Sequence, residues 1–77
     1  MINPGYYTSR DSRRLIQIHY FLCPMGAAES YYCTVYYTEP YNGYIPVSTR
    51  YKGSYVLYGD TLDPMTEEEF TARVLSL

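Results

Sequence analysis

The sequence predicts an α+β fold, with a small, strongly bent antiparallel sheet or open barrel of four to five strands and one C-terminal helix. A length of 77 residues suits one domain, 1–77. Short segments rich in Tyr, Ile, Val and Thr alternate with turn signals before residue 60. A segment with helix-capping residues follows near the C-terminus.

Turn signals divide the first part of the chain into short segments of strand composition. The expected strands lie near 5–8, 14–23, 31–38, 45–51 and 55–58. The turns between them include residues 24–30, 42–43, 52–54 and 59–64. Because proline has no N–H for a ladder, Pro46 predicts that 45–51 is an edge strand or bends early.

Side-chain alternation assigns faces to the first hairpin. The even residues of 15–23 and the odd residues of 31–38 are the more apolar sets, so both are expected to face the core. The register that joins them pairs Leu22 with Cys33, Tyr20 with Val35 and Ile18 with Tyr37. Cys23 then lies on the outer face while Cys33 faces the core, which predicts no disulfide.

The hairpin signal Asn42-Gly43 leaves two registers for the strand that follows. A strict two-residue turn would set Val35 opposite Arg50 and place a charge in the core. A one-residue bulge sets Val35 opposite Tyr51 instead, and we prefer it.

A helix is expected at about 66–75. Thr66 followed by Glu69 forms a capping-box sequence. The acidic run Glu67 to Glu69 occupies the first turn, where the helix dipole favours negative charge. Phe70 and Val74 fall on one face of this helix, which can therefore pack against the sheet.

Tyrosine dominates the apolar composition. Leu, Ile, Val and Phe together supply 16 of the 77 residues, whereas tyrosine alone supplies 12. Tyrosine buries a large ring and keeps a polar tip, so it can serve in a core and on a surface. We expect about half of the rings to fill a thin core and the rest to form an exposed patch.

Charge and catalytic residue types exclude several classes of function. The net charge of −2 excludes a polybasic protein, with +2 on residues 1–58 and −4 on residues 59–77. The single histidine, His19, belongs to no nucleophilic set, so the chain is not expected to be an enzyme and has no catalytic residue. Two cysteines and one histidine are too few for a zinc site, which predicts neither a metal nor a cofactor.

The tyrosine content favours binding to a protein partner, because interface hot spots are enriched in Tyr and Arg. The predicted protein-binding patch consists of Phe21, Tyr32 and Tyr36, with His19 at its margin and Tyr41 and Tyr44 at a hairpin tip. Candidates for its rim, or for phosphate contacts, are Arg13, Arg14, Arg50 and Lys52. Such a chain suits a phage or mobile-element inhibitor of a host complex and equally a small adaptor.

An alternative function is single-stranded nucleic-acid binding by aromatic stacking together with scattered Arg and Lys. The acidic helix weighs against this alternative. The N-terminal sequence resembles no signal peptide and no apolar run spans a membrane, which predicts a cytoplasmic location, in the host if phage-encoded. The edge strand 45–51 offers a route to a homodimer.

Overall fold

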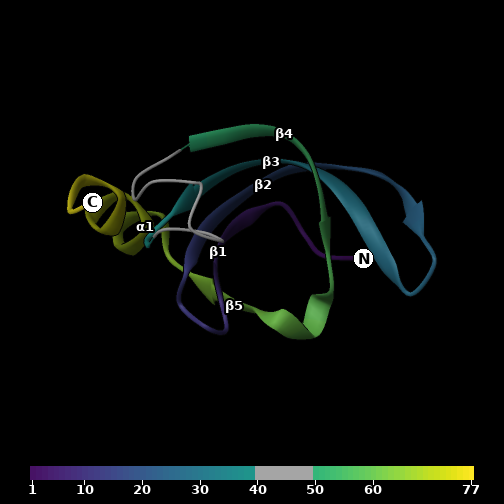
Figure 1. Ribbon diagram of the computed structural model, residues 1–77, viewed down its shortest axis with the longest axis horizontal. Helices are drawn as coiled ribbons and strands as arrows, with labels where there is room; N and C mark the ends of the chain where they lie inside the picture. Colours follow the sequence, from purple (N-terminus) through teal and green to yellow (C-terminus); the bar gives the residue numbers. More distant parts are fainter. Residues whose placement is uncertain (40–49) are drawn as a thin grey trace.

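A computed structural model describes residues 1–39 and 50–77 (Figure 1). Its five strands form one antiparallel sheet in the order β4-β3-β2-β1-β5, followed by one helix, which confirms the α+β prediction. The sheet bends so that β4 and β5 curve towards each other (Figure 1). The elements are β1 (Gly5–Ser9), β2 (Arg14–Met25), β3 (Ala28–Tyr37), β4 (Arg50–Leu57), the 3₁₀ turn η1 (Gly59–Thr61), β5 (Leu62–Met65) and α1 (Glu67–Leu75).

Strand β4 joins the end of one expected strand, 45–51, to most of the next, 55–58. Strand β4 runs without a break through residues 52–54, which were predicted as a turn. Its Gly53 pairs with Cys33, and a Cβ built on Gly53 would lie 2.9 Å from the hydroxyl of Tyr51. Glycine therefore serves close packing here and not chain reversal. Of the expected strand 45–51, residues 45–49 lie outside the described residues.

Strand β5 begins at Leu62, inside the segment 59–64 that was also predicted as a turn, and ends at Met65. It pairs with β1, where Tyr7 lies opposite Pro64. A proline is compatible with this strand because β5 lies at an edge of the sheet.

The register of the second hairpin is as predicted, with Val35 opposite Tyr51. The register predicted for the first hairpin is wrong, because Ile18 pairs with Cys33 and Ile16 with Val35. One cause is the turn, because β2 and β3 pair up to Met25 and Ala28, where the sequence predicted a loop over 24–30; the irregularities of β2 are the other. Only two residues remain for the turn, and Gly26 adopts the left-handed conformation with φ 63°.

Two irregularities in β2 change which face its later residues occupy. They lie between Ile18 and Tyr20 and between Phe21 and Cys23. Each inserts one residue in β2 that has no partner in β3, so the alternation of faces shifts by one. Tyr20 and Leu22 were predicted to face the core, but they are 52% and 42% exposed.

The core fills the inner, concave face of the sheet. Its buried side chains are Ile16, Ile18, Tyr31, Cys33, Val35, Tyr37, Leu57 and Leu62. Cys33 is buried among them while Cys23 is exposed, and neither forms a disulfide, as predicted. The thin aliphatic core is therefore completed by tyrosine rings, two of which are buried in this cluster.

Helix α1 covers part of the opposite, outer face. The capping box is present, since Thr66 Oγ1 accepts from the Glu69 N–H and the Glu69 side chain accepts from the Thr66 N–H. Phe70 is the buried residue of the helix, and its ring lies 4.9 Å from that of Tyr6. Within the described residues, no helix is both long and apolar enough to cross a membrane.

Candidate functional site

The outer face carries a group of aromatic and polar side chains that we call the outer aromatic surface, comprising His19, Tyr20, Tyr32 and Thr34. Tyr20 lies opposite Tyr32 in the ladder, and their rings stack with centroids 5.1 Å apart and planes 5° apart. His19 Nε2 lies 2.7 Å from the hydroxyl of Thr34, and its ring is 5.7 Å from that of Tyr32. The surface is thus organised by ring stacking and by one hydrogen bond.

The bulge after Ile18 creates this surface. His19 is the inserted residue, so it and Tyr20 both project from the outer face, although they are neighbours in sequence. Without the bulge, Tyr20 would face the core, as the sequence predicted. The residue that sequence reasoning missed is therefore Tyr20, because alternation alone carries no signal for an inserted residue.

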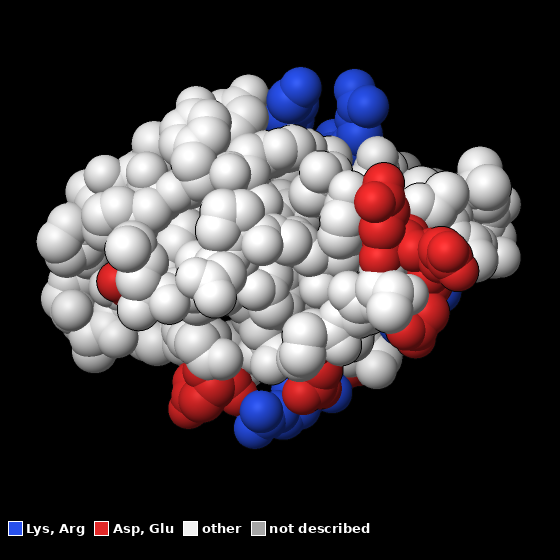
Figure 2. Space-filling model, turned by 180° about the vertical axis from the view of Figure 1, so that it is seen from behind, with Lys and Arg blue, Asp and Glu red and all other residues white. Residues whose placement is uncertain are grey.

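Cations lie along one side of this surface. Strand β4 places Lys52 opposite Thr34 and Arg50 opposite Tyr36, and both cations are exposed. Figure 2, which shows the molecule from behind the view of Figure 1, has a broad area without Lys, Arg, Asp or Glu. Lys and Arg project at the upper edge of this view, acidic side chains gather at the end where α1 lies, and side chains of both signs border the lower edge (Figure 2). The outer aromatic surface itself contains no Lys, Arg, Asp or Glu, and Lys52 and Arg50 lie beside it on β4.

The structure brings only part of the predicted patch together. His19 and Tyr32 lie in the outer aromatic surface. Tyr36 shares the outer face but is half-buried, with its ring centroid 6.0 Å from that of Phe70 in α1. It therefore helps to seat the helix. Tyr41 and Tyr44 lie outside the described residues.

Phe21 does not lie on the outer face, which corrects the sequence-based prediction. It pairs with Tyr31, whose side chain belongs to the core, and the two rings meet edge to face at 5.6 Å. The same bulge that turns Tyr20 outwards turns Phe21 inwards.

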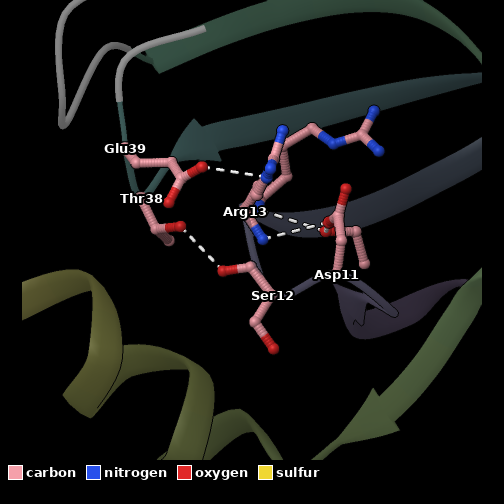
Figure 3. A network of polar contacts seen from close by, with 7 residues as sticks. Asp11, Ser12, Arg13, Thr38 and Glu39 are labelled. Atoms are coloured by element: carbon pink, nitrogen blue, oxygen red, sulfur yellow. Dashed lines mark hydrogen bonds and ion pairs between the residues drawn. The ribbon is translucent and has the colours of Figure 1, made fainter.

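Arg13 and Arg14 diverge from each other at the start of β2. The Arg13 Nε forms an ion pair of 2.9 Å with Glu39 in the network shown in Figure 3. Arg14 is half-buried, and its guanidinium donates a 2.7 Å hydrogen bond to the hydroxyl of Tyr55, which packs against the core. Of the four predicted rim cations, Arg50 and Lys52 are thus the two that flank the outer aromatic surface.

The network around Arg13 fixes the turn between β1 and β2. Asp11 Oδ1 accepts a hydrogen bond from the Ser9 hydroxyl at 2.6 Å and one from the Arg13 N–H at 3.1 Å, and Figure 3 shows Asp11 beside Arg13. These two bonds, the first above all, hold the pKa of Asp11 below its usual value. Ser12 adopts φ 61° in this turn, and its carbonyl accepts from the Thr38 hydroxyl at 2.8 Å. The network is structural, since each polar group meets another part of the same turn or the residues that follow β3.

The chemistry available at the outer aromatic surface is that of binding. Tyrosine rings offer flat apolar area and a hydroxyl, while Lys52 and Arg50 offer donors at the rim. Within residues 1–39 and 50–77, no three His, Cys, Asp or Glu side chains are grouped so that they could hold a metal ion. Burial raises the pKa of the Cys33 thiol to about 11, which keeps it protonated and unreactive at neutral pH.

Comparisons of the chain with known protein families, with curated proteins and with solved structures found no match.

Proposed function

We propose that this protein binds a protein partner through the outer aromatic surface and catalyses no reaction. The observation that carries the proposal is the stacked pair of Tyr20 and Tyr32, which holds two large rings on the outer face of the sheet. Tyr20 is 52% exposed, although it could have packed in a core that is short of aliphatic residues. A rigid aromatic pair loses little conformational freedom on binding, which is why such rings serve as interface anchors.

The charge pattern supports a partner of mixed polarity. Lys52 and Arg50 border the outer aromatic surface on β4, and the three glutamates of α1 lie in the first turn of that helix. An uncharged centre with a polar rim is the usual anatomy of a protein interface. A phage or mobile-element inhibitor of a host complex and a small adaptor, both acting in the cytoplasm, are the two settings that the sequence favours.

The proposal is tested by capture of partners from a bacterial lysate treated with nuclease, followed by mass spectrometry. Tyr20→Ala should lose a protein that the wild type retains. Tyr58→Ala is the matched control, because Tyr58 is 53% exposed, like Tyr20, and lies between β4 and η1, outside the residues of the outer aromatic surface. If Tyr20→Ala retains the same protein as the wild type while folded, the outer aromatic surface is not the binding site.

Single-stranded nucleic acid is the second candidate ligand, and the position of Lys52 favours it. Lys52 and Arg50 could contact phosphates while bases stack on Tyr20, an arrangement typical of sequence-tolerant binding. This function predicts anisotropy-detected binding of a labelled oligonucleotide that weakens steeply with salt and falls further in Lys52→Ala. If the oligonucleotide does not bind at low salt, nucleic-acid binding is contradicted and protein binding stays as the proposed function.

A further inference from the structure

The two edge strands of the sheet differ from ordinary exposed edges. In the order β4-β3-β2-β1-β5, β4 and β5 each have a described neighbour on one side only. An edge strand presents unpaired N–H and C=O groups on which another chain can add a strand. The hydrogen-bond pattern of this sheet shows which main-chain groups those are.

One hydrogen bond sets the pattern for β4. The Thr38 N–H donates to the Arg13 carbonyl at 2.8 Å, which continues the register of Arg14 opposite Tyr37. In an antiparallel ladder, hydrogen-bonded pairs alternate with non-hydrogen-bonded pairs. The main-chain N–H and C=O groups of the even-numbered residues of β3 therefore bond to β2, and those of the odd-numbered residues bond to β4.

It follows that Cys33 and Val35 bond to Gly53 and Tyr51, which lie opposite them in β4. The N–H and C=O groups of the intervening Lys52 and Ser54 point away from β3, towards the edge of the sheet. These are the groups that an added strand would use.

The same reasoning applies to β5. The Arg10 N–H donates to the Thr61 carbonyl at 2.8 Å, which continues the register of Ser9 opposite Leu62. Asp63 and Met65 therefore bond to β1, and the main chain of Pro64 faces the edge. Because proline has no N–H, Pro64 costs the sheet no ladder bond and offers an added strand no donor.

Tyr51 provides a different protection for β4. Its hydroxyl donates a hydrogen bond of 2.9 Å to the Ser54 carbonyl, one of the groups that face the edge. The ring reaches this carbonyl by lying over Gly53, where a Cβ would be 2.9 Å from the hydroxyl oxygen and 3.2 Å from the ring carbon Cζ. Glycine at 53 is therefore a requirement of this contact.

We propose that Tyr51 guards the edge of β4 against pairing with the same strand of a second copy. By donating to the Ser54 carbonyl, Tyr51 occupies one lone pair of an acceptor in the middle of the edge, so an added strand must compete with this hydrogen bond. A second copy is the partner that is excluded, because every copy presents the same eight-residue strand without proline. The exposed cations Arg50 and Lys52 add repulsion between two copies. The hydrogen bond from Tyr51 to Ser54 therefore opposes a homodimer through this edge, such as the one expected from the strand 45–51.

The test is sedimentation equilibrium of the full chain over a wide range of concentration. Tyr51→Phe removes the hydroxyl and should lower the dimer Kd by about tenfold or more relative to the wild type. Gly53→Ala should displace the ring of Tyr51 and so break the same hydrogen bond, and this variant should dimerise as Tyr51→Phe does. Tyr58→Phe is the matched control, since it removes a tyrosine hydroxyl outside this contact, and should sediment as the wild type does.

A further variant identifies the surface through which the copies associate. Lys52→Pro removes an N–H that faces the edge and leaves the bonds to β3 intact, so Tyr51→Phe with Lys52→Pro should return to the wild-type monomer. The proposal is overturned if Tyr51→Phe and Gly53→Ala, both folded by circular dichroism, associate no more than the wild type. It is also overturned if the double variant still dimerises, because the association would then use another surface.

Discussion

The ring of Tyr20 lies parallel to the ring of Tyr32, with their centroids 5.1 Å apart. This stacking exists because the bulge at His19 moves Tyr20 from the inner face to the outer face of β2. The same bulge moves Phe21 inwards, against Tyr31. One inserted residue therefore both turns Phe21 towards Tyr31 and produces the outer aromatic surface.

The bulge predicts unequal stability losses for two residues that plain alternation treats as equivalent. Ile18, 2% exposed, precedes the bulge, whereas Leu22, 42% exposed, follows it. Ile18→Ala should lower the free energy of unfolding by roughly 2–5 kcal/mol. Leu22→Ala should change it by about 0.5 kcal/mol or less. Urea denaturation of both variants measures the difference, and similar losses would mean that β2 is regular through Leu22.

The sequence predicts the elements whose signals are local. The capping residues Thr66 and Glu69 predict the helix, and the rule against a charge in the core predicts Val35 opposite Tyr51. The features it misses depend on contacts between distant residues. Gly53 and Pro64 are residue types typical of turns, but both lie in strands. Gly53 makes room for the ring of Tyr51, and Pro64 pairs with Tyr7 of β1. Tyr20 was missed from the candidate site for the same reason, since its place on the outer face depends on a bulge that pairing with β3 reveals.

The capping box makes the start of α1 sensitive to one side chain. Thr66 Oγ1 accepts from the Glu69 N–H at 3.1 Å, a donor that has no partner within the helix. Thr66→Ala should destabilise the helix by about 1 kcal/mol. Thr71→Ala is the control, because it makes the same replacement at an exposed position within the helix. Chemical shifts of the first helical turn report the effect, and equal helicity in both variants would show that the cap contributes nothing.

The two cysteines should differ in reactivity. Cys23 is exposed, whereas Cys33 is buried in the core and burial raises its pKa to about 11. Since the thiolate is the reactive form, maleimide at neutral pH should modify one thiol per native chain, and two when the chain is unfolded. Cys23→Ser should abolish the native reaction. Rapid modification of both thiols in the native protein would contradict the burial of Cys33.

The Tyr31 hydroxyl takes part in two hydrogen bonds, one of which links the N-terminal segment to the core. Its hydroxyl accepts from the Ile2 N–H at 2.6 Å and donates to Glu29 at 2.5 Å. Tyr31→Phe keeps the ring but leaves a half-buried carboxylate and an N–H without this partner. The free energy of unfolding should therefore fall by about 1–2 kcal/mol near neutral pH.

The same hydroxyl should make stability depend on alkaline pH. Burial first, and then Glu29, raises the pKa of Tyr31 above its usual value, so the folded state favours the protonated phenol. Its contribution is fully present below about pH 10, the unfolded value, and is lost as pH rises through the higher folded value. The stability difference between the wild type and Tyr31→Phe should thus shrink with rising pH in guanidinium titrations. Cys33 titrates in both proteins, so this difference isolates Tyr31, and a difference that stays constant up to high pH would contradict the assignment.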